Sequence, residues 1–449
     1  MAALGMGGDK SLKLSLSDTF RLAWSDEDLR PRIMFILLMF GLYALGVHIP
    51  VPIPGVDPGE MAKLLENNSF LGLLNMFGGG AFKRLSVLAL GMNPYITASI
   101  IMQVMTFANP AWKQEMQEGG EFARRQQNRR TRLLTLALCV FQGMGLLTLL
   151  GQAIPAVASM TVIVKIASIV FWTAGAMFLL WMGEQLSEKG IGNGVSLLIF
   201  AGIVISLPNV TQSLYQAIQS GTIPIWQGAM VIVAFFAMTW FVVMFSIAQR
   251  RIPIQHMRRN YGTKTLGGQT SYLPISVNMA GVIPIIFAIS LVYMPAQFMQ
   301  AFPAGSPIYN VLSTITDFMS PNFGSWKGYV GAAVYTFLIF IFCYLWNAMV
   351  FNVEDMSNQL KRHGSYIPGI RPGKQTTDFL NGVVSRVTFV GAVFLAVVAL
   401  TPYMFSSIAA VSGLSLIAGT SLLIMVSVAL ETMRQIEANI LTKQYGGGG

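Results

Sequence analysis

Ten long apolar runs divide the sequence, and each is close to the length that an α-helix needs to cross about 30 Å of hydrocarbon. Charged residues make up only 11% of the 449 residues, whereas soluble domains carry roughly 25%. The runs therefore predict an all-α polytopic membrane protein with ten transmembrane helices, of which the fifth is short. The expected helices cover, to within about 2–4 residues, 31–50, 85–108, 132–154, 161–182, 193–208, 224–248, 276–298, 328–351, 383–405 and 413–433.

The basic residues predict how these helices are oriented. When the connecting segments are assigned alternately to two sides, 24 of the 29 Lys and Arg residues fall on the side that carries both termini. Connections on the cytosolic side hold the excess of Lys and Arg in membrane proteins. Both termini are therefore expected in the cytosol, as an amphipathic N-terminal segment at 1–30 and a short tail at 434–449. The first apolar run follows charges of both signs, so no removable signal peptide is expected.

A stretch at 70–90, in which three glycines interrupt a half-length apolar run, does not fit this count as an eleventh helix. If it crossed the membrane, every later connection would change sides and the distribution of basic residues would reverse. The stretch is therefore expected to be re-entrant or interfacial on the outer side. Irregular backbone is tolerated at membrane depth only beside protein or a water-filled cavity, so it indicates a cavity open to the outside. A hairpin lying on lipid headgroups is the alternative.

The expected helices carry almost no ionisable residues in their interiors. Lys165 and Glu184 lie near helix ends, and the three histidines (His48, His256 and His363) are too dispersed to form a cluster. The sequence contains no carboxylate pair for acid–base work and no recognisable zinc, nucleophile or phosphate-binding motif. It therefore predicts neither an enzyme nor a bound metal or cofactor. Transporters that couple to protons or sodium usually hold ionisable residues within their helices, which argues against a solute transporter.

Two connections on the cytosolic side are strongly basic. The first, 249–275, contains five basic residues and no acidic one, and the second, 352–386, contains five basic and three acidic residues. Proline, glycine and tyrosine punctuate both, which favours structured turns over loose charged chains. Such surfaces attract anionic lipid, or they dock a polyanion such as RNA, or an acidic protein. Composition leaves these explanations open.

Particular strings carry more information than the composition does. The specific ones are GGGAFKRLSVLALGMNPYITASIIMQ at 78–103, GEQLSEKGIGNGVSLLIFAGIV at 183–204, QRRIPIQ at 249–255, VNMAGVIPIIFA at 277–288, FNVEDMSNQLKRHGSYIPGIRPGKQT at 351–376 and GTSLLIMVSVALETMRQIEA at 419–438. They follow one another in order along nearly the whole chain. Together they closely resemble the SecY family, the central subunits of the bacterial protein-translocation channel.

The resemblance implies an architecture and a constriction. Family members have ten helices in two inverted, pseudo-symmetric halves, here 31–208 and 209–433, around an hourglass channel sealed midway by aliphatic side chains. A narrow apolar constriction gates by dewetting. The family motifs carry this ring over to Met92, Ile96, Val195, Ile199, Ile286 and Ile424. Met92 and Val195 stand where the family more often has isoleucine, which implies a somewhat looser ring.

The resemblance also assigns the stretch at 70–84 to a plug. The residues carried over to the plug are Phe70, Asn75, Gly78, Gly79, Gly80, Lys83 and Arg84. The second and third helices should face the seventh and eighth across a lateral gate open to lipid, with Thr97, Gln103 and Asn278 as candidate polar contacts. A buried hydrogen bond between helices averages only about 0.6 kcal/mol, so an arriving signal sequence can break it. Ordinary packing of adjacent helices is the alternative for Thr97 and Gln103.

For the basic connections, the resemblance implies docking of the ribosome or of the ATP-driven motor SecA. The docking residues expected are Arg250, Arg251, Arg258, Arg259, Arg371 and Lys374. Further expected partners are the small membrane subunits SecE and SecG, signal-sequence-bearing polypeptides and anionic lipids. The expected function is a protein-conducting channel of the bacterial plasma (inner) membrane, which passes unfolded secretory polypeptides and releases transmembrane helices into lipid, driven by a bound motor or ribosome. A secondary transporter with an inverted repeat is the runner-up.

Overall fold

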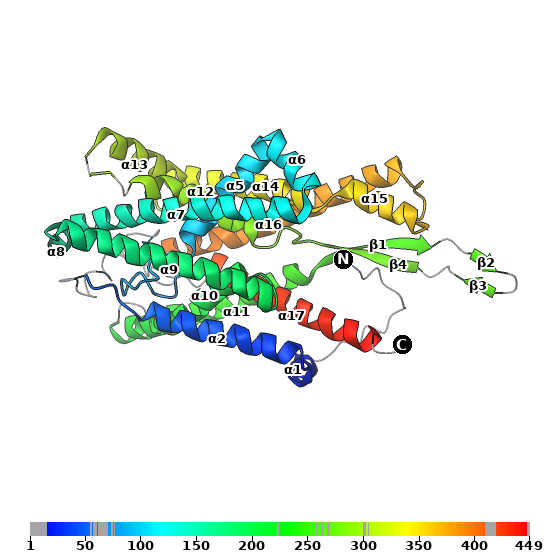
Figure 1. Ribbon diagram of the computed structural model, residues 1–449, viewed down its shortest axis with the longest axis horizontal. Coiled ribbons are helices and arrows are strands. Elements are labelled where there is room, and N and C mark those ends of the chain that lie inside the picture. Colours follow the sequence, from blue (N-terminus) through cyan, green and yellow to red (C-terminus); the bar gives the residue numbers. More distant parts are fainter. Residues whose placement is uncertain are drawn as a thin grey trace.

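The computed structural model describes residues 16–53, 56, 61, 71–72, 75, 77–221, 224–256, 259–261, 264–266, 270–299, 302–303, 305–408 and 419–446. Ten helices within these residues correspond to the ten expected spans, and they run roughly along the long axis of the molecule (Figure 1). They are α2 (Leu29–Val47), α5 (Asn93–Ala108), α7 (Gly120–Ala153), α9 (Val162–Lys189), α10 (Gly194–Gln219), α11 (Ile225–Ile247), α12 (Ile283–Met299), α14 (Trp326–Val350), α16 (Lys374–Ile408) and α17 (Thr420–Gly446). Seven helices in the described ranges are long and apolar enough to cross a membrane, and α12 is apolar but shorter.

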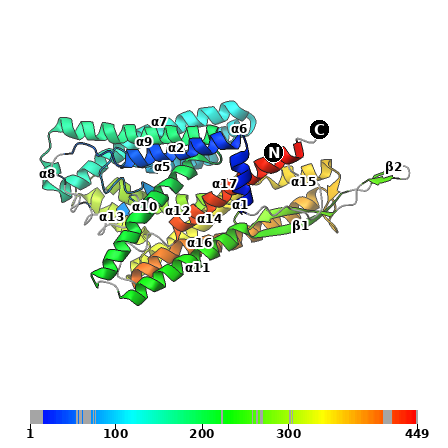
Figure 2. The same cartoon turned by 90° about the horizontal axis from the view of Figure 1, so that it is seen from below.

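The two ends of the bundle carry different elements (Figures 1 and 2). One end, called the basic end here, carries the last turns of α17 together with α1 (Leu16–Ser25), α6 (Pro110–Glu118), α15 (Val353–Arg362) and the strands β1 (Gln249–His256) and β4 (Thr270–Ser276). The opposite end, called the far end, carries the short helices α8 (Pro155–Ala158) and α13 (Pro307–Met319). The strongly basic connections therefore lie together at one end, as the charge pattern predicts.

Several helices begin or end well outside the expected spans, and α5 and α10 illustrate two different reasons. The second expected span was placed from residue 85, but α5 begins only at Asn93, because Leu85 (φ 44°) and Gly91 (φ 56°) have left-handed backbone that interrupts a helix. The fifth span was expected to be short, but α10 extends 26 residues and contains Pro208. The apolar run ends at that proline, whereas the helix continues through it.

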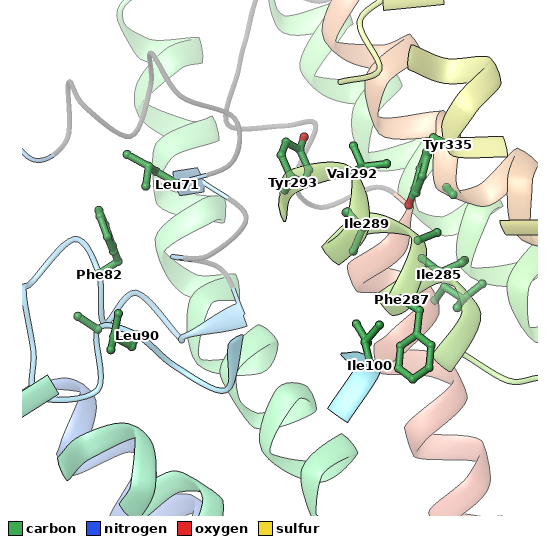
Figure 3. Packing of buried hydrophobic residues seen from close by; sticks show 14 of the residues in the cluster. Leu71, Phe82, Leu90, Ile100, Ile285, Phe287, Ile289, Val292, Tyr293 and Tyr335 are labelled. Carbon is green, nitrogen blue, oxygen red and sulfur yellow. The ribbon is translucent and has the colours of Figure 1, made fainter. Parts of the chain in front are cut away.

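Two hydrophobic clusters form the core of the bundle. The larger one joins the segment before α5 to α7, α12, α14 and α16, and Figure 3 shows Leu71, Phe82 and Leu90 of that segment on one side of it, with residues of α12 on the other. The second cluster joins α2, α9, α10 and α17 to the same segment. The described residues between α2 and α5 are therefore part of the core of the bundle.

A small sheet extends the bundle at the basic end. Strand β1 pairs antiparallel with β4, in register Gln249↔Ser276 to Gln255↔Thr270, and also with β5 (Ser365–Tyr366). Ile252 and Ile254 of β1 are buried while Arg251 is exposed, which is the period-2 alternation of a strand with one covered face. Strands β2 (Arg259–Tyr261) and β3 (Lys264–Leu266) pair beyond it. Both basic connections thus contain ordered elements, as their turn residues predict.

Candidate functional site: constriction, insert and basic surface

The described residues of 71–92 form an insert that packs closely against three helices; residues 71–72, 75 and 77 are helical and 78–92 are irregular. Glycines of α9 and α10 allow the close approach, because a methyl group at Gly175 would overlap the Val87 carbonyl oxygen and one at Gly202 would overlap that of Phe77. The hydroxyl of Tyr43 on α2 donates to the Phe77 carbonyl oxygen (3.4 Å). Backbone contacts this close require residues without a side chain. The insert therefore packs directly against these two glycines.

Short-range hydrogen bonds fix the conformation of the insert. The side-chain oxygen of Asn75 accepts from the backbone N–H of Lys83 (2.8 Å), and its carbonyl oxygen accepts from that of Gly80 (2.7 Å). Gly79 and Gly80 have φ values of 67° and 84°, which favour glycine. Outside this turn, a backbone bridge joins Pro50 to Ser86. The insert is therefore a defined turn and not a loose loop.

The predicted plug residues fall into buried and exposed groups. Gly78, Gly79 and Gly80 are buried, whereas Lys83 and Arg84 point outward. A guanidinium nitrogen of Arg84 lies 2.5 Å from Nε2 of His48, at the end of α2. Asn75 holds the turn described above, and Phe70 lies outside the described residues.

All six residues predicted for the constriction lie in or against one hydrophobic cluster. Met92, Ile199 and Ile424 are buried within it, and Ile96, Val195 and Ile286 pack against it half-buried. They come from α5 and the residue that precedes it, α10, α12 and α17, so four separated segments of the chain converge here. Phe77, Ala81 and Leu88 of the insert belong to the same cluster or pack against it. The residues predicted for the constriction therefore lie in one aliphatic cluster that is continuous with the insert.

A groove lies between α5, α12 and α14, and we call it the seam. Its volume is about 60 Å³, and Gln103 is its single polar lining residue. The side-chain amide nitrogen of Gln103 donates to Ser99 (3.2 Å), while its oxygen has no hydrogen-bond partner within the described chain. The lining residues are Gln103, Val104, Ile283, Pro284, Phe287, Phe342, Leu345, Trp346 and Met349.

The three polar residues predicted for the gate are not bonded to one another. The oxygens of Thr97 and Asn278, like that of Gln103, are buried without a partner among the described residues. Unpaired buried polar atoms destabilise a resting structure. A substrate or partner that satisfies these atoms would therefore gain from the contact.

The residues that do connect the helices across this region are amides that the sequence analysis missed. Asn93 donates to Gln142 of α7 (3.5 Å), and Gln142 donates to Gln297 of α12 (2.9 Å). Amide side chains within expected spans 132–154 and 276–298 were the available signal, because polar residues inside a membrane usually bond across helices. These three residues are called the amide chain below.

The two basic connections are parts of one folded body, called the basic surface. Buried Ile252 and Ile254 of β1 pack with Val353 and Leu360 of α15 and with Leu380 of α16. The predicted docking residues Arg250, Arg251, Arg371 and Lys374 are exposed on this body. Arg259 lies in β2, and Arg258 lies outside the described residues.

The turn that carries Arg371 is held in a specific conformation. Gly369 and Gly373 flank it with φ values of 82° and 109°, and the Arg371 carbonyl oxygen accepts from the hydroxyl of Thr376 (2.9 Å). The hydroxyl of Ser357 on α15 donates to the Gly373 carbonyl oxygen (3.2 Å). The backbone is therefore fixed while the guanidinium points to solvent, as recognition of an anionic surface requires.

Ion pairs join chain segments at the basic end. Glu184, which the sequence analysis placed simply near a helix end, makes a two-point pair with Arg132 of α7 (2.7 and 2.8 Å). Lys443 of α17 binds Asp26 (2.7 Å) and Asp28, which follow α1. The hydrogen bond from Lys443 lowers the pKa of Asp26, and the bonds to Asp26 and Asp28 raise the pKa of Lys443. The described part of the chain contains no group of His, Cys, Asp or Glu that could hold a metal ion.

Apolar helices of membrane-spanning length that surround an aliphatic cluster, with an insert packed against it, are the arrangement of a membrane channel. A model of the SecY family matches residues 86–433. The chain belongs to the SecY family.

Curated relatives support this assignment over nearly the whole chain. Protein translocase subunit SecY of Pseudomonas aeruginosa is 38% identical over 421 residues, which cover 93% of this chain and 92% of that protein. The protein of the same name from Escherichia coli K12 is 37% identical over 424 residues, 93% of each chain. That of Halalkalibacterium halodurans is 38% identical over 441 residues, 96% of this chain and 99% of that protein. The family is one of channel subunits and not of enzymes.

Solved structures support the fold. A protein-conducting channel has a TM-score of 0.66 at 18% identity over 93% of this chain and 94% of its own. A SecY whose plug domain stabilises the closed state of the translocation channel has a TM-score of 0.66 at 19% identity over 93% of both chains. Sec61 in the canine ribosome–channel complex has a TM-score of 0.64 at 16% identity over 93% and 94%. The expected fold, ten transmembrane helices with a plug, is confirmed.

Proposed function

We propose that this chain is the protein-conducting subunit of a translocase, which passes unfolded secretory polypeptides across the membrane and releases transmembrane helices sideways into lipid. The observation that carries the proposal is the aliphatic constriction, against which the insert packs. Aliphatic side chains exclude water and ions by dewetting at rest, yet they form no bond that would retain a passing polypeptide. Because the channel supplies no energy of its own, a bound partner must drive transport.

The insert is the plug in this proposal. It packs against the constriction and is seated on Gly175 and Gly202 without a covalent tie or an ion pair to α9 or α10 among the described contacts. A polypeptide that enters the constriction from the basic end must displace it. The halves 31–208 and 209–433 then separate at the seam.

The seam is the lateral gate. Its apolar lining suits the apolar segment of a signal sequence, and the unpaired oxygen of Gln103 offers a hydrogen bond to an arriving chain. The amide chain holds α5, α7 and α12 together at rest. Interhelical hydrogen bonds of this kind contribute about 0.6 kcal/mol each on average, so the free energy of substrate binding can exceed their contribution.

The basic surface is the docking site for a ribosome or for the motor SecA. The fixed turn with Arg371 and the adjacent arginines Arg250 and Arg251 of β1 present cations on one body. Two structural neighbours are ribosome-bound, the canine Sec61 channel and the idle yeast Ssh1 complex. SecE and SecG are proposed as partners within the membrane, and anionic lipids as partners at its surface.

The chain is proposed to lie in the bacterial plasma membrane with its basic end in the cytosol. The 24 of 29 basic residues on the side of both termini support this orientation. Ribosome and motor then reach the basic surface directly, and the far end faces outward.

The proposal is tested by ATP-dependent transfer of a signal-bearing precursor into vesicles that hold this chain with SecE-type and motor partners. Arg371→Glu should impair transfer while folding and membrane insertion stay normal, because an exposed turn contributes little to the bundle. Lys165→Glu, the same charge reversal at the far end, is the control and should transfer normally. Normal transfer by Arg371→Glu would show that this turn is not the docking site. No transfer by the well-folded wild-type complex would reject the channel.

A further inference from the structure

Helix α13 (Pro307–Met319), which connects α12 to α14 at the far end, has one apolar and one polar face. Ser306 precedes it, and the hydroxyl of that serine accepts from the backbone N–H of Tyr309 (3.2 Å). The spacing of the apolar residues, at intervals of three and four, places them on one side. The apolar stripe consists of Ile308, Val311, Leu312, Ile315 and Met319, and the polar stripe of Asn310, Ser313, Thr314 and Asp317.

The protein covers only part of the apolar stripe, where Met319 packs against the larger core cluster. Ile308 is 53% exposed, Val311 60% and Ile315 41%. No residue of α13 is buried, although its neighbours α12 and α14 have well-packed cores. A helix of 13 residues is marginal in water on its own, and a contiguous exposed apolar stripe indicates a contact surface. Something outside the chain therefore covers this face.

Contacts between α13 and the first turn of α14 set the depth of the helix. The ring of Phe318 meets that of Trp326 edge to face with centroids 5.7 Å apart, and the ammonium of Lys327 lies 5.5 Å from the Phe318 ring centroid. Trp326 and Tyr329 are 67% and 58% exposed. Exposed Trp and Tyr at the end of a membrane helix mark the boundary between headgroups and acyl chains, and a neighbouring Lys extends its charge toward water. Because α13 contacts this belt, it lies at the same level.

We propose that α13 is an interfacial helix whose apolar stripe inserts into the outer boundary of the lipid bilayer. Val330 and Phe337, which lie on the same side of α14 as Trp326, are also exposed. A helix with one apolar face, a polar opposite face and aromatic residues beside it binds in the plane of the membrane in this way. The lipid contact does not depend on whether the channel conducts polypeptides.

The position of α13 gives the lipid contact a role at the seam. Helices α12 and α14, which α13 joins, supply most of the lining of the seam, including Phe287 and Trp346. An anchor in the headgroup layer ties the outer ends of both helices to the bilayer. When α12 moves away from α5, α13 must move within the headgroup layer. The free energy of opening the seam therefore depends on the lipids at the outer surface of the bilayer.

The test uses the full chain in vesicles of phosphatidylcholine and phosphatidylglycerol, with the environment-sensitive fluorophore NBD attached to single cysteines. Val311→Cys places the probe on the apolar stripe, and Thr314→Cys places it on the polar stripe one turn away. The native Cys139 and Cys343 are buried, and a protein without an added cysteine gives the background labelling. We expect the probe at 311 to emit at shorter wavelength, to be quenched by lipids spin-labelled near the headgroup and to be shielded from iodide. The probe at 314 should show the reverse.

Equal exposure of the two probes to iodide would refute the proposal. Shielding of position 311 from iodide without quenching by spin-labelled lipid would also refute it, because a protein partner or a second copy of the chain would then cover the stripe. Ile315→Cys and Asn310→Cys repeat the comparison with independent positions, so a variant that does not fold leaves the test intact.

Discussion

Replacing Gly202 of α10 with alanine should unseat the insert. The new methyl group would overlap the Phe77 carbonyl oxygen and stand 3.1 Å from its carbon, against an ordinary contact of about 3.5–4.0 Å. Overpacking of this kind typically costs about 1–3 kcal/mol. Alanine also favours the helix by about 1 kcal/mol, but that gain is the same whether the insert is docked or displaced. The displaced population should therefore rise between about fivefold and about 150-fold.

Ion conductance of the reconstituted complex across planar bilayers measures the displaced population. Gly202→Ala should raise the resting conductance, with normal thermal stability of the bundle. Gly41→Ala is the matched control, because that glycine lies in α2 with nothing within 4 Å of the added methyl group, and its conductance should equal the wild type. Equal conductance of all three proteins would show that the contact with Phe77 does not hold the insert in place.

Three further predictions concern the constriction, the amide chain and the basic end. Ile96→Ser or Ile286→Gly should raise the resting ion leak because a polar or wider constriction wets more easily, and unchanged conductance in both would remove them from it. Gln142→Leu should favour separation of α7 from α12 by about threefold, from the one lost hydrogen bond between these helices of about 0.6 kcal/mol. Disulfide trapping between cysteines placed on α7 and α12 measures this separation, and unchanged trapping would contradict the bridge. The lowered pKa of Asp26 contributes stability that is lost as pH falls through it, and the raised pKa of Lys443 contributes stability that is lost as pH rises through it. Contact of α1 with α17 should therefore be tightest from about pH 4 to about pH 10 and weaken with salt, as followed by hydrogen exchange in α1; exchange that ignores both pH and salt would contradict it.

The sequence predicts the membrane helices well because hydrocarbon requires a long apolar run for each. The same logic misplaces several helix ends, of which the start of the second span and the end of the fifth are instructive. The apolar run from residue 85 belongs partly to the insert, where Leu85 and Gly91 are left-handed, and apolar content cannot distinguish buried irregular backbone from helix. Pro208 ends the fifth run, but α10 continues beyond it, because a proline inside a membrane helix is tolerated.

The sequence predicts some site residues and misses others, because contacts between residues that are distant in the sequence leave no local signal. Motif resemblance selected six constriction residues that the fold then brings into one cluster. It did not select Gln142 and Gln297, which lie 155 residues apart and become partners only when α7 and α12 are adjacent. Likewise, the basic connections gave no sign that β1 and α15 share a core. Charge and turn residues are local signals, whereas joint packing depends on the completed fold.

The length of α16 has a mechanical consequence. It starts immediately after the turn with Arg371 and extends 35 residues, about 50 Å at 1.5 Å per residue, and its single described proline, Pro402, lies near the far end. The helix is tied sideways to α14 by the side chains of Asn347 and Thr388 (2.6 Å). A helix resists compression along its axis, so a push on the turn is transmitted to α14 near the basic ends of the two membrane spans. Helix α16 thus couples a load on the turn at the basic surface to a displacement of α14.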